Sequence, residues 1–185
     1  MMRALVLLCL LLSDVARAAS VSPTPAERVA LAPPAASVGF RAYGLGLLPL
    51  DGNFTRFDGV LTYDPSDHGH CRVELRIDVA SLAMSSPVIR NDVLGPDFMD
   101  AAQFPTLQFG GICQPAGLVG TLAMHGVSRP FALDLDWERV AVTAQGRLRR
   151  AEWGMTAKPF IGGATVRITV RTSLSPLHSA AGAQH

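Results

Sequence analysis

The sequence has little net charge and few of the largest aromatic residues. Its 16 lysines and arginines nearly match its 15 aspartates and glutamates, and it has two tryptophans and two tyrosines. A balanced charge argues against nucleic acid or an anionic membrane as the main partner. No apolar run after residue 18 is long enough for a transmembrane helix. We therefore expect no nucleic-acid partner and no transmembrane span.

The sequence also lacks the motifs of common catalytic and phosphate-binding sites. It contains no G-x-S-x-G, C-x-x-C or H-E-x-x-H pattern and no glycine-rich phosphate loop. His125 precedes Gly126 at an expected hairpin, where a turn residue is favoured over a catalytic base. We therefore predict no enzyme activity, no catalytic residue and no cofactor.

One short cluster contains side chains that can bind metals. His68, His70 and Cys71 could together hold zinc or copper. The cluster directly follows an expected turn at residues 64–67, and Cys71 has a competing partner in Cys113. A metal site is therefore the less favoured interpretation, and we predict none.

Cysteine is scarce, with three residues in the chain. Cys9 lies in the first eighteen residues, which leaves Cys71 and Cys113 as an even pair. Cys71 opens one expected strand and Cys113 closes the next, so antiparallel pairing would bring them together at one end of the ladder. We predict a disulfide that closes a loop of roughly 40 residues and contributes about 3–4 kcal/mol. Two buried free thiols are the alternative.

The first eighteen residues are typical of a secretory signal peptide. Arg3 is followed by an apolar run from Ala4 to Leu12 and by a small-x-small pattern at Ala16–Ala18. Leu8 precedes Cys9 where a lipoprotein signal would have a small residue, so we expect no lipid anchor. We predict an exported protein that is periplasmic or secreted.

The rest of the chain is organised as one domain between two irregular segments. Residues 19–36 are rich in proline and alanine and are predicted to be a linker, and residues 175–185 are predicted to be a disordered tail. Between them, apolar and charged residues alternate as in strands with one buried face. The eight predicted strands are Ser37–Tyr43, Gly52–Tyr63, Cys71–Val79, Thr106–Ile112, Gly117–His125, Phe131–Glu138, Val140–Leu148 and Thr165–Thr172.

Eight antiparallel strands in one domain, here residues 37–174, are most simply closed into a barrel, because closure removes the exposed edges. An outer-membrane barrel also alternates, but it has aromatic girdles that two tryptophans and two tyrosines do not supply. Gly59, Gly111 and Gly120 would also interrupt its strands. We therefore expect a mainly β fold, an eight-stranded antiparallel soluble barrel.

One segment between the predicted strands has helical spacing. Leu94, Phe98 and Ala101 recur at i, i+4 and i+7, and Pro96 fits a first helical turn. Pro105 disfavours helix at the residue before it, so the helix should end there. We predict a short inserted helix whose apolar face forms a plug or lid over one end of the barrel.

The predicted inward faces are almost entirely apolar. A barrel of this size can be filled by side chains or can hold one ligand. The chain has 17 glycines, several inside strands, where they cost stability but allow a ligand or another backbone to approach closely. A lipid carrier is the favoured interpretation. A packed barrel that binds a protein partner is the alternative, and an enzyme would need a polar catalytic group that these faces do not supply.

Four sequence segments follow one another in an informative order. Residues 37–65 contain a G-x-F-x-x-F-x-G spacing, residues 90–109 contain arginine, aspartate, phenylalanine and proline at spaced positions, and GTLAMHGVSRPFAL and LRRAEWGM follow. The residues that carry the first two matches are Gly52, Phe54, Phe57, Gly59, Arg90, Asp92, Phe98, Asp100, Pro105 and Phe109. Together these segments resemble the YceI-like family of bacterial exported lipid-binding proteins.

This resemblance implies a lipocalin-like antiparallel barrel with a helix inserted between two strands. It also implies that the lumen holds an amphiphile, either a polyisoprenoid or a quinone with an isoprenoid tail. A homodimer and a membrane redox protein that donates or accepts the lipid are further candidate partners. The chain departs from the family at Tyr43-Gly44, where histidine is common, and at residues 162–164, where an acidic residue is common. The chemistry of the head group therefore stays open.

Strand parity and the predicted helix identify candidate lumen-lining residues. They are Phe40, Phe57, Leu61, Leu75, Ile77, Phe98, Leu107, Phe109, Leu122, Met124, Phe131, Leu133, Trp153 and Met155. For each of them, contact with a lipid and packing in the core are both open. Arg90 with Asp92, and Arg149 and Arg150 with Glu152, could grip a polar head group at the barrel mouth, although a solvated face is favoured.

Overall fold

The computed structural model of the chain describes residues 26–45, 47–157 and 163–174. The predicted signal peptide (1–18), the first part of the predicted linker (19–25) and the predicted tail (175–185) lie outside the described residues. Within them strands dominate, with one short α-helix and two 3-10 helical turns. No helix in these three ranges is long and apolar enough to cross a membrane.

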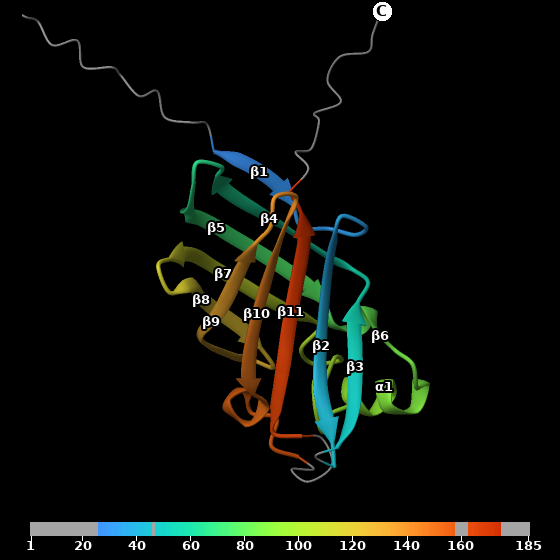
Figure 1. Ribbon diagram of the computed structural model, residues 1–185. Coiled ribbons are helices and arrows are strands. Elements are labelled where there is room, and N and C mark those ends of the chain that lie inside the picture. The colour runs from blue at the N-terminus through green and yellow to red at the C-terminus, as the bar shows by residue number, and fades with distance from the viewer. Residues whose placement is uncertain (1–25, 46, 158–162, 175–185) are drawn as a thin grey trace, which may run out of the picture.

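One antiparallel sheet of eleven strands contains all the strands described (Figure 1). They are β1 (Glu27–Ala30), β2 (Ala36–Gly44), β3 (Leu48–Phe54), β4 (Phe57–Asp64), β5 (Asp67–Asp78), β6 (Leu82–Met84), β7 (Thr106–Gln114), β8 (Gly117–Met124), β9 (Val127–Trp137), β10 (Ala141–Arg149) and β11 (Thr165–Ser173). Their order is β1-β4-β5-β7-β8-β9-β10-β11-β2-β3-β6. The helical elements are η1 (Val79–Ser81), α1 (Pro87–Leu94) and η2 (Arg150–Trp153).

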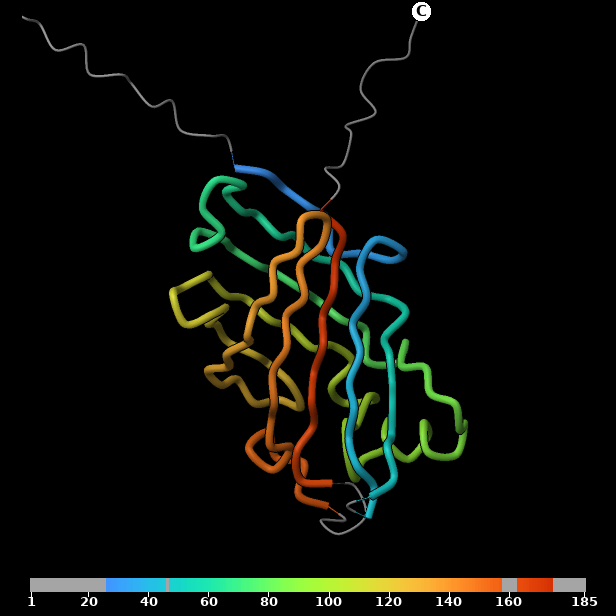
Figure 2. Tube along the Cα trace, in the orientation of Figure 1, coloured from blue at the N-terminus to red at the C-terminus, as the bar shows by residue number. Residues whose placement is uncertain are grey.

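The sheet curls so that its two halves face each other. In Figures 1 and 2, β10, β11, β2 and β3 run along one side, and β4, β5, β7 and β8 cross behind them. Side chains from both halves form one apolar core. The predicted mainly β, lipocalin-like antiparallel fold is confirmed. The terminal strands β1 and β6 pair with β4 and β3, so the hydrogen bonds of the described strands form a curled half-barrel with more than the eight predicted strands.

The predicted strand over Gly52–Tyr63 is two strands, which is one reason for the higher number. The strand is interrupted at residues 55–56, where the Thr55 N–H donates to the Ser81 carbonyl at 3.2 Å. The Asp78 N–H donates to the Arg56 carbonyl at 3.1 Å. As a result, β3 pairs with β2 and β6, whereas β4 pairs with β1 and β5. The three-residue β6 is too short to show an alternation in the sequence.

The prediction of a linker over residues 19–36 is wrong from Glu27 onward. Residues 27–30 form β1, which pairs with β4, and the Leu31 N–H donates to the Gly59 carbonyl at 2.9 Å. Val29 and Leu31 are buried in the core. The proline- and alanine-rich composition concealed these two apolar side chains, which cover part of the core.

The predicted inserted helix exists but was placed too late in the chain. Helix α1 ends at Leu94, where the predicted apolar stripe begins. Its first turn has Pro87 at its start, and the Ser86 hydroxyl caps it by accepting from the Ile89 N–H at 3.4 Å. Gly95 ends the helix in an extended conformation, and hydrogen-bonded turns occupy residues 95–103. Capping therefore determined the position of this helix, and the apolar spacing did not.

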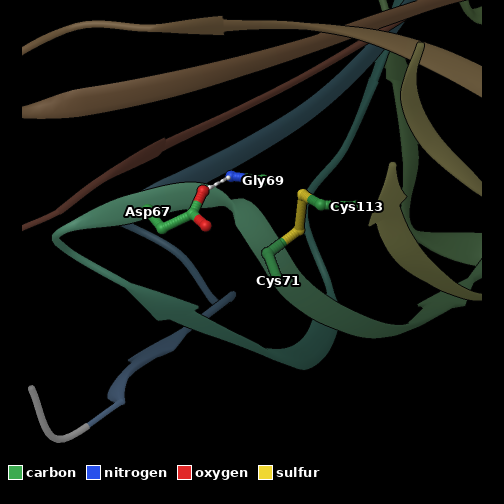
Figure 3. The surroundings of a disulfide bond; sticks show 4 residues. All are labelled: Asp67, Gly69, Cys71 and Cys113. Atoms are coloured by element: carbon green, nitrogen blue, oxygen red, sulfur yellow. Dashed lines mark hydrogen bonds between the residues drawn. A yellow bond between two sulfur atoms is a disulfide. The ribbon is translucent and has the colours of Figure 1, made fainter. Parts of the chain in front are cut away.

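A disulfide joins Cys71 of β5 to Cys113 of β7 (Figure 3). The adjacent residues Arg72 and Ile112 are partners in the ladder, so the two cysteines continue that register by one position. Their Cα atoms lie 4.8 Å apart. The bridge therefore fastens β5 to β7 at one end of their pairing.

Candidate functional site

The curled sheet encloses an apolar cavity of about 450 Å³. Small-molecule sites in proteins have volumes of this order. Side chains alternate between the two faces of each strand, and those on the inner face form the cavity wall. In β9, Phe131, Leu133 and Leu135 face the cavity, while Asp134 and Asp136 are exposed. The structure therefore has room for a hydrophobic ligand inside the sheet.

All the predicted lumen-lining residues except Phe57 and Trp153 lie in the cavity wall. Those that line it are Phe40, Leu61, Leu75, Ile77, Phe98, Leu107, Phe109, Leu122, Met124, Phe131, Leu133 and Met155. Phe57 and Trp153 are buried in the core but do not line the cavity. For these two residues the prediction is corrected.

Trp153 does not line the cavity because its segment is not a strand. Residues 150–153 form the 3-10 helix η2, so strand parity does not apply there. The indole N–H donates to the Leu122 carbonyl at 3.3 Å, and the ring meets Phe131 edge to face at 6.0 Å between centroids. Trp153 thus contacts two residues of the cavity wall, Leu122 and Phe131, without lining the cavity itself. Phe57 opens β4 opposite Ile77, where it packs in the core.

Apart from Phe40 of β2, the part of the wall contributed by β10, β11 and β2 is missing from the predicted set. Its residues are Val38, Ala42, Val142, Ala144, Leu148, Val166, Ile168 and Val170. The alternation in the sequence was the signal that could have identified most of them, because the polar residues Arg167 and Thr169 separate the valines and isoleucine of β11. Leu45 and Leu48 also line the cavity, but Leu45 lies in the turn after β2 and Leu48 is the first residue of β3, so neither follows a periodic signal.

Two glycines on inward-facing positions leave space for aromatic rings of the wall. A Cβ atom at Gly52 would lie 2.6 Å from the ring of Phe40, and one at Gly146 would lie 2.9 Å from the ring of Phe131. Both are closer than a side chain tolerates. These glycines therefore have a packing reason inside strands that they otherwise weaken.

One cation is buried in the cavity wall. Arg150 is almost completely buried, and its Nε donates to the Gly163 carbonyl at 2.8 Å and its Nη1 to the Met155 carbonyl at 2.7 Å. The guanidinium lies 5.1 Å from the centre of the Phe98 ring. Burial lowers the pKa of Arg150 from its ordinary value. Sequence reasoning favoured a solvated face here, because burial of one arginine in a charged run has no local signature.

The polar residues of the wall are few and separated. Asp92 and Arg150 lie in the segments around α1 and η2, whereas Thr172 lies near the end of β11. Arg90, expected as a partner of Asp92, instead donates to the Leu82 carbonyl at 2.5 Å and thereby anchors α1 to β6. The cavity thus has its charged groups at the end nearest α1 and an apolar wall along most of its length.

A cluster of rings lies at the other end of the cavity. Trp137 lines the cavity, and its ring stacks on His68 at 4.2 Å between centroids. Tyr63 lies 5.4 Å from the same indole, and its hydroxyl donates to Glu27 Oε2 at 2.7 Å. Burial, together with the hydrogen bond to Glu27, raises the pKa of Tyr63 to about 12. The cluster ties β1, β4, β5 and β9 together.

Tyr63 predicts a loss of stability at alkaline pH. Its pKa is raised from 10.0 to about 12, so the unfolded state releases the proton first. The stabilisation is therefore complete below pH 10 and is lost as the pH rises toward 12. We expect the urea midpoint to fall more steeply over this range in the wild type than in Tyr63→Phe. Equal slopes would contradict the prediction, and the exposed Tyr43→Phe change is the matched control.

The residues of the possible metal cluster have other partners. Cys71 is in the disulfide, the His68 ring stacks on Trp137, and His70 Nδ1 lies 2.7 Å from Asp67 Oδ2. Asp67 also accepts the Gly69 N–H, as Figure 3 shows, and these contacts lower the pKa of its carboxyl. Over the described ranges, no group of three or more metal-binding side chains occurs.

His125 occupies the β8–β9 hairpin. It and Gly126 both have positive φ angles, 52° and 74°, which two-residue type I′ loops require. Its Nδ1 lies 3.1 Å from the Trp153 carbonyl, and its ring lies 4.6 Å from Phe104. These contacts give His125 a structural place in the turn.

The fold and the cavity together define a class of protein, an antiparallel lipocalin-like sheet curled around an apolar binding cavity. The family model of the YceI-like domain matches residues 30–174 of the chain. The protein belongs to the YceI-like family.

Known proteins resemble the chain at low sequence identity. A UPF0312 protein of Vibrio cholerae is 27% identical over 108 residues, which cover 55% of this chain and 57% of that protein. The chain thus matches little more than half of that relative's length. The crystal structure of BcnA from Burkholderia cenocepacia superimposes with a TM-score of 0.65 at 20% identity, covering 75% of this chain and 95% of BcnA. A polyisoprenoid-binding domain from Saccharophagus degradans has a TM-score of 0.56 at 13% identity, with 80% and 98% covered.

Proposed function

We propose that the protein is an exported carrier that holds a polyisoprenoid, or a quinone with an isoprenoid tail, inside the curled sheet. The observation that carries this proposal is the cavity of about 450 Å³, whose wall is apolar along most of its length. The polyisoprenoid-binding domain of Saccharophagus degradans, which has the same fold, supports the choice of ligand class. The disulfide between Cys71 and Cys113 supports a periplasmic or secreted location, because oxidising compartments preserve such bonds.

The cavity suggests how the ligand lies. The hydrocarbon tail would run between the two halves of the sheet. The head group would lie near Asp92 and Arg150, because these two charged residues are in the cavity wall. Each buried methylene-sized group contributes about 0.8 kcal/mol, so ten carbons would give about 8 kcal/mol before ordering costs. That free energy corresponds to a dissociation constant of about 1 μM. Tail length alone therefore gives useful affinity without a specific polar contact.

We favour carriage over catalysis because of the chemistry of the wall. Among the described residues that line the cavity there is no histidine, serine or lysine. Cys71 lines it only as part of a disulfide. A carrier needs a donor and an acceptor for its lipid, and a membrane redox protein would suit a quinone in particular.

The decisive experiment is native purification followed by mass spectrometry of the organic extract. The proposal predicts one isoprenoid or quinone in near-stoichiometric amount. The delipidated protein should then take up the same lipid when it is added back. A clean extract together with no uptake would exclude the carrier and favour a packed module that binds a protein partner.

A further inference from the structure

The turn between β2 and β3, together with the first residue of β3, exposes a group of large apolar side chains. Leu45, Leu47 and Leu48 are 63%, 84% and 60% exposed, and the neighbouring Tyr43 is also exposed. We call Leu45, Leu47 and Leu48 the leucine tip. Figure 1 shows this turn at the lower end of β2 and β3. Contiguous exposed apolar groups of this kind mark interaction surfaces.

The leucine tip is continuous with the cavity. Leu45 and Leu48 line the cavity as well as being exposed, and Leu50 continues the lining into β3. Leu47, the most exposed of the three, does not line it. The tip is therefore the rim of the cavity, and a surface bound there would lie beside the opening through which a lipid could pass.

A row of arginines lies on the outer face of the sheet, and its member on β2, Arg41, precedes Leu45 of this tip by four residues. Arg147 of β10 is opposite Arg167 of β11, which is opposite Arg41 of β2, and Arg41 is opposite Asp51 of β3. Arg41 is paired with Asp51, with Nε–Oδ1 and Nη2–Oδ2 distances of 2.6 and 2.9 Å. Over the described ranges, Arg147 and Arg167 have no acidic partner. Exposed Arg149 follows two residues after Arg147.

This row has an energetic cost in the free protein. Like charges directly opposite each other on neighbouring strands destabilise a sheet. Asp51, the acidic residue in this row, is already paired with Arg41. The near-zero net charge of the chain therefore conceals a local excess of positive charge on the strands that lead to the apolar tip.

We propose that the leucine tip and the arginine row dock the protein on an anionic lipid bilayer, with the cavity opening toward the membrane. The leucines enter the interfacial region, and Arg147 and Arg167 contact lipid phosphates. The inference rests on the proposed carrier function, since it supplies the route by which the lipid enters. A bilayer is chosen because an apolar tip ends β2, and two arginines that have no acidic partner among the described residues lie in register with Arg41 of the same strand. Such an arrangement matches the acyl chains and the phosphates of a lipid interface.

The test is flotation of the mature protein with vesicles that contain no isoprenoid. We expect binding to vesicles of phosphatidylglycerol and phosphatidylcholine, much weaker binding to phosphatidylcholine alone, and release by salt. Replacing Arg147 and Arg167 by glutamine should weaken binding about 30-fold, since each surface arginine contributes about 1 kcal/mol. The matched control is Arg28→Gln with Arg72→Gln, which removes the same charge from β1 and β5.

The leucine tip is tested separately by Leu47→Asp. This change should weaken flotation at least about tenfold, because Leu47 would no longer enter the interface. Val140→Asp is the control, since Val140 is 65% exposed in the β9–β10 turn at the opposite end of the molecule (Figure 1). Variants that float like the wild type, or a wild type that does not float, would overturn the proposal. A dimer that Leu47→Asp dissociates, without any change in flotation, would assign the tip to a second copy of the chain.

The same variants separate this inference from the carrier function. Uptake of a polyprenol delivered from cyclodextrin, without vesicles, should be unchanged in Leu47→Asp. A wild type that floats but takes up no lipid would refute the carrier and leave docking in place. A wild type that takes up lipid but does not float would refute docking alone.

Discussion

Replacing Ala144 with phenylalanine is expected to abolish uptake of a long-chain isoprenoid while the protein stays folded. Ala144 lies in the cavity wall on β10, opposite Leu135 of β9 and Val170 of β11, which also line the cavity. The added ring would occupy space that the hydrocarbon needs. We expect the dissociation constant to rise about 100-fold or more, which corresponds to excluding three or four methylene groups. Displacement of a fluorescent amphiphile by farnesol or a longer prenol measures this change.

The matched control places the same ring on the other face of the sheet. Ala132 lies in β9 with its side chain exposed, so Ala132→Phe adds equal bulk outside the cavity and should bind lipid like the wild type. Insertion of a ring into a packed core would cost about 1–3 kcal/mol, whereas insertion into an empty cavity should cost less. Normal lipid binding by Ala144→Phe would place the ligand outside the cavity. A large loss of stability would indicate a packed interior.

The alternation of apolar and charged residues was enough to predict the fold class and much of the cavity wall. In β5, Val73, Leu75 and Ile77 alternate with Glu74 and Arg76, and the first three line the cavity as parity requires. The same rule failed at Trp153, where a 3-10 helix replaces the strand. Parity identifies the side that faces inward, but it cannot show whether the interior is filled. The volume of the cavity therefore needed the structure.

Other features have no signature in the local sequence. The β1 strand is stabilised by pairing with β4, so its residues read as a linker when taken alone. Helix α1 begins at the Ser86 cap, although a stronger apolar spacing follows Gly95. Arg150 can be buried because it donates hydrogen bonds to the carbonyl groups of Met155 and Gly163, which the fold brings close to it. In each case a hydrogen bond or strand pairing that the apolar pattern does not encode determined the local structure.

The disulfide was predictable because Cys71 and Cys113 lie at the start and the end of two expected strands, and antiparallel pairing of these strands brings the two residues together. Replacing Cys71 and Cys113 together by alanine is expected to lower the free energy of unfolding by about 4 kcal/mol. The bridge closes a loop with a sequence separation of 42, and the lost loop-closure entropy of the unfolded chain sets this value. For a domain of this size the melting temperature should fall by about 10 °C. Calorimetry with and without a reductant measures the effect.

The reductant supplies the control for this prediction. Reduced wild type should melt near the double variant, and the double variant should not respond to the reductant at all. Because Cys71 also lines the cavity, lipid affinity at a temperature where both forms are folded separates a local change in the wall from a loss of stability. Equal melting temperatures for oxidised and reduced wild type would contradict a stabilising role. A large shift would support the proposed location in an oxidising compartment, because the disulfide joins β5 to β7 across the long segment that contains α1.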